Sequence, residues 1–425
     1  MTPPPDARAA ATAKAPKQRL IGLDGMRGLL ALSVILVHTM GALAPLVLTA
    51  THLDLLGQVI VVFFALSGFL IYWPFASRII SNRPLGSISD YLRNRALRVY
   101  PAYIVIFLFA NFVLAGSFLS NAMETMVPYT DAGTGVITNP LDLLLHLTLL
   151  QNFFPSGLQT GINSSWTLTV ELTFYVVLPL LAIAVHRVGA TWKRSRYLLA
   201  ALPALALIAL GVVFRGIAWA IQLIGGVSVL DAEWGANWLG VLSRSFLVWS
   251  DNFGFGMLAI VAYIAAKNGA LVSLGRVSLR AVATLSLIGG LLFAAVCLVL
   301  RLPWLSTGVA LASGAFFLLL LLPVRTREHP RYAAVLDWAP FHYIGLISLS
   351  VYLWHYPVLL TIIRLGWAGP DTPLGAAYNV ALVAVFSIAA GSVTYWLIER
   401  PAQRWRPRPR FTALDKNPEK SASEV

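Results

Sequence analysis

Long apolar stretches separated by short polar connections run along nearly the whole 425-residue chain. A helix needs about 20 apolar residues to span the hydrocarbon core of a bilayer, and ten stretches meet that length. They are 28–48, 56–76, 100–120, 166–186, 198–225, 245–266, 281–301, 304–323, 342–364 and 377–398. The pattern predicts an all-α integral membrane protein with about ten transmembrane helices.

Composition agrees with this prediction and excludes a soluble globular protein. Hydrophobic residues make up 58% of the chain and charged residues only 12%. The single cysteine, Cys297, lies in an apolar run, which excludes an internal disulfide and leaves little room for a metal cluster. We therefore expect no metal ion.

Lysine and arginine gather on one side of the predicted spans. If the N-terminus lies in the cytosol and the spans alternate, all but four of the 31 Lys and Arg residues fall in cytosolic segments. The four exceptions are Arg215, Arg244, Arg301 and Arg364. Such a bias is typical of cytosolic loops, so both termini are expected in the cytosol. The net charge of +13 then indicates topology and lipid contact, with no nucleic-acid partner.

The segments outside the spans are short, with two exceptions. The basic segment 78–98 is expected in the cytosol, and 121–165, which holds no Lys or Arg, is expected outside. Part of the latter, 141–154, is apolar but too short to span, which predicts an interfacial or re-entrant helix. The domain prediction is a disordered cytosolic tail at 1–20, one membrane domain at 21–400, and a basic disordered tail at 401–425 that binds anionic lipid heads.

The first apolar stretch carries ionisable residues only near its ends. Arg27 and His38 are eleven residues apart. At about 100° per residue, that spacing returns to nearly the same helical face roughly 16 Å further along the axis. A histidine inside a span costs free energy unless it faces the bundle interior or a wet cavity, so one interpretation is functional. A hydrogen bond to a neighbouring helix is the other interpretation.

Seven short motifs follow one another along the predicted membrane domain. They are DGMRG at 24–28 followed by His38, VFFALSGFLI at 62–71, RALRVYPAY at 95–103, NSSWTLTVE at 163–171, FGMLA at 255–259, SVYLWHYP at 350–357 and ERP at 399–401. Each motif is weak alone, but in this order they resemble the membrane-bound acyltransferase 3 family. The resemblance covers residues 23 to 401.

The resemblance implies an O-acyltransferase in a bacterial cytoplasmic membrane. Members of the family move acyl groups from coenzyme A onto hydroxyls of glycans, glycolipids and some secondary metabolites. We therefore expect acyl-CoA, most simply acetyl-CoA, as co-substrate, no permanently bound cofactor, and an envelope glycan or glycolipid as acceptor. A tailoring enzyme for a secondary metabolite is one alternative. A secondary transporter is an alternative of another class, because ionisable residues inside spans also mark transport paths.

The chain departs from the family pattern in two places. Many relatives carry a second acidic residue and a glutamine after the motif glutamate, where this chain has Leu172 and Thr173, so only Glu171 is carried over. Many relatives also bear a hydrolase-like domain that completes transfer outside, and no such domain follows the last predicted span here. A partner protein that completes the transfer is therefore an open expectation.

The donor site is expected at the cytosolic side. Acyl-CoA carries several phosphate charges, and Arg95 and Arg98, at i and i+3, share a helix face that can pair with them. Arginines in a cytosolic segment also serve topology alone, and their spacing does not separate the two interpretations. Arg27 is expected to hold a phosphate or the pantetheine region, and Asp24, three residues earlier, is expected to orient it.

His38 is expected where a thioester entering from the cytosol arrives. A neutral imidazole suits a general base that takes the proton of the acceptor hydroxyl as its oxygen attacks the thioester carbonyl. Such a base needs an orienting partner, and Glu171, about five residues into a helix entered from outside, is the candidate. The other interpretation of Glu171 is a structural ion pair with Arg215 or Arg364.

Further candidates are expected near the acceptor. Tyr352 and His355, three residues apart, either position the acceptor or bond neighbouring helices. Trp166 heads the fourth span, where it either anchors the protein at the membrane interface or stacks on a sugar. The glycine in the motif at 255–259 is typical of close helix packing.

Overall fold

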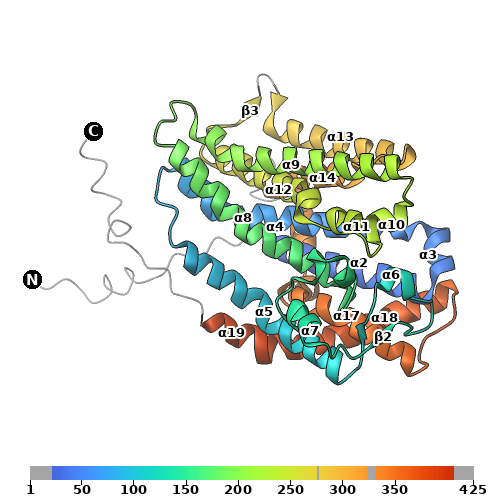
Figure 1. Cartoon of the computed structure of the whole chain (residues 1–425). Coiled ribbons are helices and arrows are strands. Elements are labelled where there is room, and N and C mark those ends of the chain that lie inside the picture. Colours follow the sequence, from blue (N-terminus) through green and yellow to red (C-terminus); the bar gives the residue numbers. More distant parts are fainter. Residues whose placement is uncertain (1–21, 275–276, 324–330, 406–425) are drawn as a thin grey trace, which may run out of the picture.

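The computed structural model describes residues 22–274, 277–323 and 331–405. The predicted tail 1–20 and residues 406–425 of the predicted C-terminal tail lie outside this part of the chain. Figure 1 shows a bundle of long helices. The strands of the described residues are two antiparallel pairs, β1 (Ser117–Phe118) with β2 (Thr134–Gly135) and β3 (Ser273–Leu274) with β4 (Val277–Ser278). The all-α membrane fold expected from hydropathy is confirmed.

The helices follow the apolar stretches of the sequence. The long ones are α2 (Leu23–Leu43), α4 (Val59–Ile80), α5 (Ile88–Phe112), α8 (Trp166–Val188), α9 (Arg196–Gly225), α12 (Phe246–Lys267), α13 (Leu279–Val299), α14 (Leu305–Leu321), α17 (Ser348–Arg364) and α18 (Pro373–Thr394). The short ones are α3 (Pro45–Thr51), α6 (Ala122–Thr125), α7 (Pro140–Leu147), α10 (Val229–Trp234), α11 (Trp238–Ser243), α15 (Arg331–Leu336), α16 (Ala339–Leu346) and α19 (Arg400–Arg404). Single 3-10 turns are η1 (Leu53–Gln58), η2 (Gln151–Phe153), η3 (Pro155–Gly157) and η4 (Asn163–Ser165), and η5 (Tyr395–Glu399) is a π-turn.

Eight helices of the described residues are long and apolar enough to cross a membrane. A ninth span results only if α16 and α17, which are bent by 78° at a break, count as one. The predicted span 304–323 forms the 17-residue α14, which is shorter than a usual span. All ten predicted stretches are therefore helical, and eight or nine helices of the described residues are long enough to span, where the sequence predicted about ten. Apolar length alone does not show where a helix breaks.

The third predicted span begins much earlier than expected. Its helix, α5, starts at Ile88, where the Ser87 hydroxyl accepts a hydrogen bond of 3.1 Å from the Asp90 N–H. Such a cap satisfies one of the unpaired N–H groups at a helix start. Arg95 and Arg98 therefore stand inside α5, whereas the sequence prediction placed them in the cytosolic connection 78–98.

The first motif packs α2 tightly against α16. A Cβ added at Gly28 would lie 2.2 Å from the Phe341 carbonyl oxygen, and one added at Gly345 would lie 1.8 Å from the Asp24 carbonyl oxygen. Only glycine fits at such distances. α2 ends before Pro45, earlier than the predicted 28–48, because Pro45 starts the next helix.

The contact between α4 and α12 depends on glycine in the same way. A Cβ at Gly256 would lie 1.8 Å from the Ala65 carbonyl oxygen, and one at Gly68 would lie 2.1 Å from the Phe253 carbonyl oxygen. The close-packing interpretation of the motif at 255–259 is therefore confirmed. Small residues at such crossings let helix backbones approach closely in membranes.

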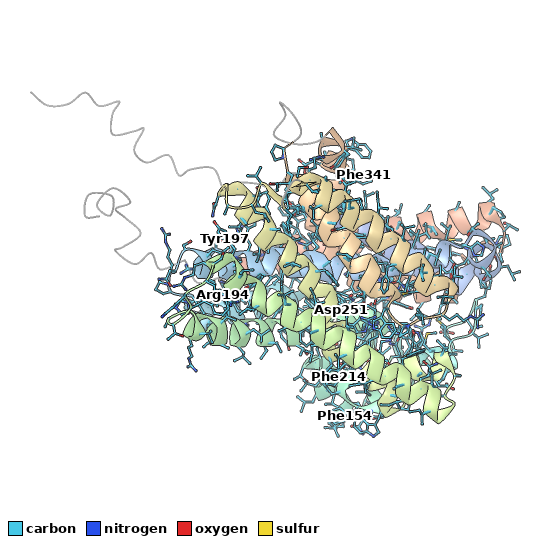
Figure 2. All side chains as sticks on the ribbon, turned by 90° about the horizontal axis from the view of Figure 1, so that it is seen from above. Phe154, Arg194, Tyr197, Phe214, Asp251 and Phe341 are labelled. Carbon is cyan, nitrogen blue, oxygen red and sulfur yellow. The ribbon has the colours of Figure 1, made fainter. Side chains whose placement is uncertain are left out.

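The two ends of the bundle carry different segments. In Figure 1 the turn between α4 and α5, the connection between α8 and α9, and α19 lie at the left end, whereas α3, α10 and the turn between α17 and α18 lie at the right. Figure 2 places Arg194 and Tyr197 at one end and Asp251 among the helices. This arrangement agrees with the expected alternation of sides, and the cytosolic placement of either end stays a prediction.

Candidate active site

A cavity of about 130 Å³, here called the arginine cavity, lies among α2, α4, α5, α8 and α17. Arg27 of α2 and Arg95 and Arg98 of α5 line it together with Glu171 of α8. Arg27 lies within electrostatic range of both Arg98 and Glu171. With Tyr352 of α17, which also lines it, the structure therefore brings five of the sequence-predicted site residues into one cavity.

The two arginines of α5 have different partners. The Arg95 guanidinium carbon lies 5.8 Å from the ring centres of both Tyr91 and Tyr175, and its Nε is buried with no hydrogen-bond partner among the described residues. Arg98 Nη1 forms a salt bridge of 2.9 Å with Glu399 Oε1. One guanidinium is thus held by aromatic rings and the other by a carboxylate.

Asp24 has a different neighbour from the one expected. Its Oδ2 lies 3.9 Å from Nδ1 of His342 on α16, and Asp24 is not among the described residues that line the arginine cavity. The charge of the Asp24 carboxylate still acts electrostatically on Arg27. The orienting contact predicted between the two side chains is thus reduced to electrostatics at a distance, because Asp24 faces α16 and Arg27 faces the cavity.

Glu171 is the sixth residue of α8, at the depth expected from sequence. Its Oε1 accepts a hydrogen bond of 2.9 Å from the Ser67 hydroxyl. The structural pairing considered for it, with Arg215 or Arg364, is wrong. Each of those arginines pairs with an aspartate instead, at 2.8 Å and 2.5 Å respectively.

A second cavity of about 420 Å³, here called the tryptophan cavity, adjoins the first. His38, Gln58 and Arg244 line it together with Trp166, Trp234 and Trp249. The two cavities share three lining residues, Ile60, Thr167 and Tyr352. Histidine and arginine are thus combined here with large aromatic surfaces.

The shared lining, here called the wall, lies where the two cavities meet. The Thr167 and Tyr352 hydroxyls are hydrogen-bonded at 2.8 Å, and the Tyr352 hydroxyl donates to the Ser164 carbonyl at 2.9 Å. Arg27 lines only the arginine cavity and His38 only the tryptophan cavity. Arg27 and His38, which share one face of α2, therefore line different cavities that meet at this hydrogen-bonded wall.

The imidazole of His38 is held by a residue that the sequence analysis did not assign. His38 Nδ1 is hydrogen-bonded to the Tyr356 hydroxyl at 3.0 Å, and Asn163 Nδ2 donates to the same hydroxyl at 3.1 Å. Glu171, expected to orient the imidazole, has Ser67 as its hydrogen-bond partner instead. It stands one helical turn past Thr167, on the far side of the wall.

His355 lies directly beside His38. Their ring centres are 5.2 Å apart, and His355 is fully buried. His355 Nδ1 is hydrogen-bonded to the Tyr352 carbonyl, and its Nε2 has no hydrogen-bond partner among the described residues. α17 therefore contributes Tyr352, His355 and Tyr356 to the surroundings of His38.

Trp166 begins α8, as predicted, but it is only 7% exposed. Its ring centre lies 5.3 Å from that of Trp249 and 5.0 Å from the Arg244 guanidinium. Arg244 also stacks on Trp234 at 3.1 Å and donates to Glu233 Oε2 at 3.1 Å. The interpretation of Trp166 as a membrane-interface anchor does not fit this burial, because Trp234 of α10 and Trp249 of α12 pack against its ring.

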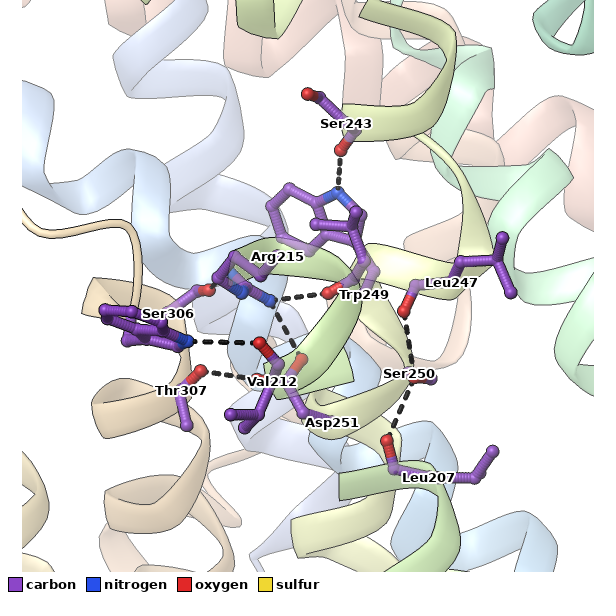
Figure 3. Close-up of polar contacts among 12 residues, drawn as sticks. Leu207, Val212, Arg215, Ser243, Leu247, Trp249, Ser250, Asp251, Ser306 and Thr307 are labelled. Carbon is purple, nitrogen blue, oxygen red and sulfur yellow. Dashed lines mark hydrogen bonds and ion pairs between the residues drawn. The ribbon is translucent and has the colours of Figure 1, made fainter. Parts of the chain in front are cut away.

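A buried ion pair borders the tryptophan cavity and is drawn in Figure 3. Arg215 Nη2 bonds to Asp251 Oδ1 at 2.8 Å and to the Val248 carbonyl at 2.7 Å, and Nη1 bonds to the Ser306 hydroxyl. The Thr307 hydroxyl donates to the other Asp251 oxygen at 2.5 Å. Asp251 is fully buried, so within the described part of the chain its charge is compensated by Arg215 and the Thr307 hydroxyl.

The segment between α5 and α8 is tied to the end of α17. Arg364 bonds to Asp131 Oδ2 at 2.5 Å and to the Ala115 carbonyl and Thr134 hydroxyl, both at 2.7 Å. The hydrogen bond from Arg364 lowers the pKa of Asp131 below its ordinary value. The predicted helix at 141–154 is the short α7 followed by a 3-10 turn.

Tyr356 and Glu399 are the partners that the sequence analysis left without a role. Both stand inside motifs that had been recognised, SVYLWHYP at 350–357 and ERP at 399–401. Their position inside these motifs was therefore the sequence feature that could have marked Tyr356 and Glu399 as functional. Which side chain each would meet was not visible in the linear sequence.

Comparisons with known proteins identify the family of the chain. A family model described as an acyltransferase domain matches residues 20–397. "Acyltransferase MdmB" of Streptomyces mycarofaciens is 27% identical over 412 residues, covering 93% of this chain and 95% of that protein. "Nodulation protein 10" of Rhizobium leguminosarum bv. viciae is 23% identical over 362 residues, covering 82% of each. No solved structure gives a significant match. The chain is a multi-pass membrane acyltransferase and belongs to the acyltransferase 3 family.

Proposed function

We propose that the protein transfers an acyl group, most simply acetyl, from acyl-CoA to a sugar hydroxyl of an envelope glycan or glycolipid in a bacterial cytoplasmic membrane. One observation carries the proposal. His38 lines the tryptophan cavity, which adjoins a cavity lined by three arginines across a thin hydrogen-bonded wall. Acyl transfer needs two substrates that meet at a base, and this arrangement supplies two sites and the base.

The arginine cavity suits the donor. The phosphates of coenzyme A are best held by guanidinium groups, which bind phosphate oxygens through two parallel hydrogen bonds. Arg27, Arg95 and Arg98 supply three such groups to one cavity. Arg95 is the strongest candidate, because no carboxylate pairs with it among the described residues and its Nε has no partner.

The tryptophan cavity suits a neutral sugar as acceptor. Its volume of about 420 Å³ lies in the usual range for small-molecule sites. Tryptophan rings offer apolar surface to the C–H face of a sugar, while Gln58 and Glu233 offer hydrogen bonds to its hydroxyls. Both arginines of the cavity already pair with carboxylates, Arg244 with Glu233 and Arg215 with Asp251. An anionic acceptor would therefore find no uncompensated cation.

His38 would act as the general base. In the tautomer whose Nδ1–H donates to Tyr356, Nε2 is free to take the proton of the acceptor hydroxyl as its oxygen attacks the thioester carbonyl. The ester C–O bond forms, the C–S bond breaks, and the imidazolium returns its proton to the sulfur of coenzyme A. The thioester reaches His38 by passing the Thr167–Tyr352 wall, which requires that hydrogen bond to open.

The test uses purified protein in lipid nanodiscs with radiolabelled acetyl-CoA and a panel of neutral sugars and glycolipids. We expect a labelled product, detected by mass spectrometry as an acceptor heavier by one acetyl group. His38→Ala should abolish the product, while His52→Ala, which alters an exposed histidine, should not. Membranes with and without the protein that show no acyl difference in their lipids and glycans, together with no product in vitro, would contradict the proposal.

A further inference from the structure

Glu399 is a buried carboxylate that the mechanism above does not use. It ends the π-turn η5, which joins α18 to α19, and it is 1% exposed. A π-turn departs from regular helix geometry and is found frequently at functional sites. The carboxylate is therefore placed by a special backbone feature inside the bundle.

Three donors converge on this carboxylate. Its Oε1 accepts Arg98 Nη1 at 2.9 Å and Gln403 Nε2 at 3.1 Å, and its Oε2 accepts the Ser350 hydroxyl at 3.1 Å. The donors come from α5, α17 and α19, three elements far apart in sequence. Such a satisfied site holds a negative charge in one position with little freedom to move.

The same Arg98 lines the arginine cavity, and its side chain is 19% exposed. One side of its guanidinium is thus bonded to Glu399 while the residue also borders the cavity. A phosphate bound in that cavity would meet a cation that already has an anionic partner. Glu399 and the phosphate would compete for the charge of Arg98.

We infer that Glu399 is a positioning residue that acts through Arg98 as a built-in competitor of the donor's phosphates. It fixes the Arg98 guanidinium at the cavity and lowers the affinity for coenzyme A, so that the product leaves after transfer. The inference rests on the proposed function, because it requires coenzyme A in the arginine cavity.

A structural role and a competing charge predict opposite results for Glu399→Gln. A glutamine can keep all three hydrogen bonds, since its oxygen accepts from Arg98 and Gln403 and its amide donates to Ser350. Only the charge is lost. Coenzyme A should then bind more tightly, on the order of fivefold for one charge removed a few ångströms beyond the direct contact. A merely structural glutamate would give unchanged or weaker binding.

The experiment measures coenzyme A binding to the full-length protein in nanodiscs by calorimetry, with kinetics of acetyl transfer in parallel. For Glu399→Gln we expect a lower Kd and a lower KM, together with a lower kcat where product release limits turnover. The matched control is Ser350→Ala, which removes one hydrogen bond to Glu399 and no charge. It should leave the Kd within about twofold, as small uncharged changes usually do.

Two further variants keep the test decisive if Glu399→Gln does not fold. Gln403→Glu adds a second carboxylate beside Glu399 at a half-buried position and should weaken coenzyme A binding. In Arg98→Ala protein, the change Glu399→Gln should have a smaller effect than in wild type, because the two residues act as a pair. Equal effects in both backgrounds, or no opposite change between the two charge variants, would overturn the inference.

The failure of this inference and the failure of the proposed function look different. If wild-type protein does not bind coenzyme A, or if Arg95→Ala binds it as tightly as wild type, the donor assignment is wrong and the inference falls with it. If wild type binds coenzyme A, Arg95→Ala weakens that binding and Glu399→Gln does not tighten it, only the role of Glu399 is refuted.

Discussion

Removal of the Asp251 carboxylate should destabilise the protein strongly. Asp251 is fully buried, and its two oxygens accept Arg215 at 2.8 Å and Thr307 at 2.5 Å. In Asp251→Ala the Arg215 charge keeps only neutral partners, the Val248 carbonyl and the Ser306 hydroxyl. Arg215 is only 7% exposed, so water that enters the tryptophan cavity compensates its charge only in part.

The size of the effect follows from the charge that is left behind. Breaking a buried ion pair by removing one partner costs about 3–5 kcal/mol. At 1.4 kcal/mol per factor of ten, this lowers the ratio of folded to unfolded protein by roughly 10²- to 4 × 10³-fold. Asp251→Asn keeps the shape and the acceptor oxygen, so its cost should be smaller. The double variant Arg215→Met, Asp251→Ala removes both charges and should recover a large part of the loss.

Thermal unfolding in detergent micelles measures these differences. Tryptophan fluorescence is a suitable signal, because the Trp249 ring centre lies 5.8 Å from the Arg215 guanidinium. Since membrane proteins often unfold irreversibly, the variants are ranked at one scan rate. Asp54→Ala, at an exposed carboxylate, serves as control and should change stability by less than about 0.5 kcal/mol. An Asp251→Ala protein as stable as this control, or a double variant no better than Asp251→Ala, would refute the reasoning.

Four other predictions follow from the same structure. His38→Ala should bind acyl-CoA normally yet transfer acyl groups about 10²- to 10⁴-fold more slowly, measured by single-turnover kinetics, and near-normal turnover would remove His38 from the mechanism. Arg95→Ala should weaken coenzyme A binding in calorimetry, and Arg95→Lys should restore it only partly, because a point charge replaces a planar fork. The pKa of Asp131 is held below its ordinary value by Arg364, so the pair stabilises the segment at 117–135 above about pH 4 and loses that contribution as pH falls further. Pepsin cleavage of this segment, normalised at each pH to cleavage of an unfolded substrate, should rise below that pH in wild type, and this normalised rise should be absent in Asp131→Asn. A tag after Val425 should be shielded in intact cells and a tag within 121–140 should be accessible, and outside labelling of the former would reverse the topology.

The linear sequence was sufficient for the fold class and for the ends of most helices. A bilayer has a nearly constant thickness, so the length of an apolar stretch, which is a local property of the sequence, decides whether the segment can span it. Order and spacing of motifs were sufficient to assign Arg27, Arg95 and Arg98 to one donor site, and the structure brings them together in the arginine cavity, where it also places Glu171, which had been assigned to His38. The length of an apolar stretch does not predict where a polar side chain caps a helix or where a helix breaks, as at the bend between α16 and α17.

Only the tertiary structure decided which side chains meet. Tyr356 and His38 are 318 residues apart in the sequence, and Glu399 and Arg98 are 301 residues apart. Periodicity orders residues along one helix, but it says nothing of how that helix is rotated against its neighbours. That rotation is set by packing, as where Gly28 leaves no room between α2 and α16. It decided that Arg27 and His38, on one face of one helix, line two cavities with a hydrogen-bonded wall between them.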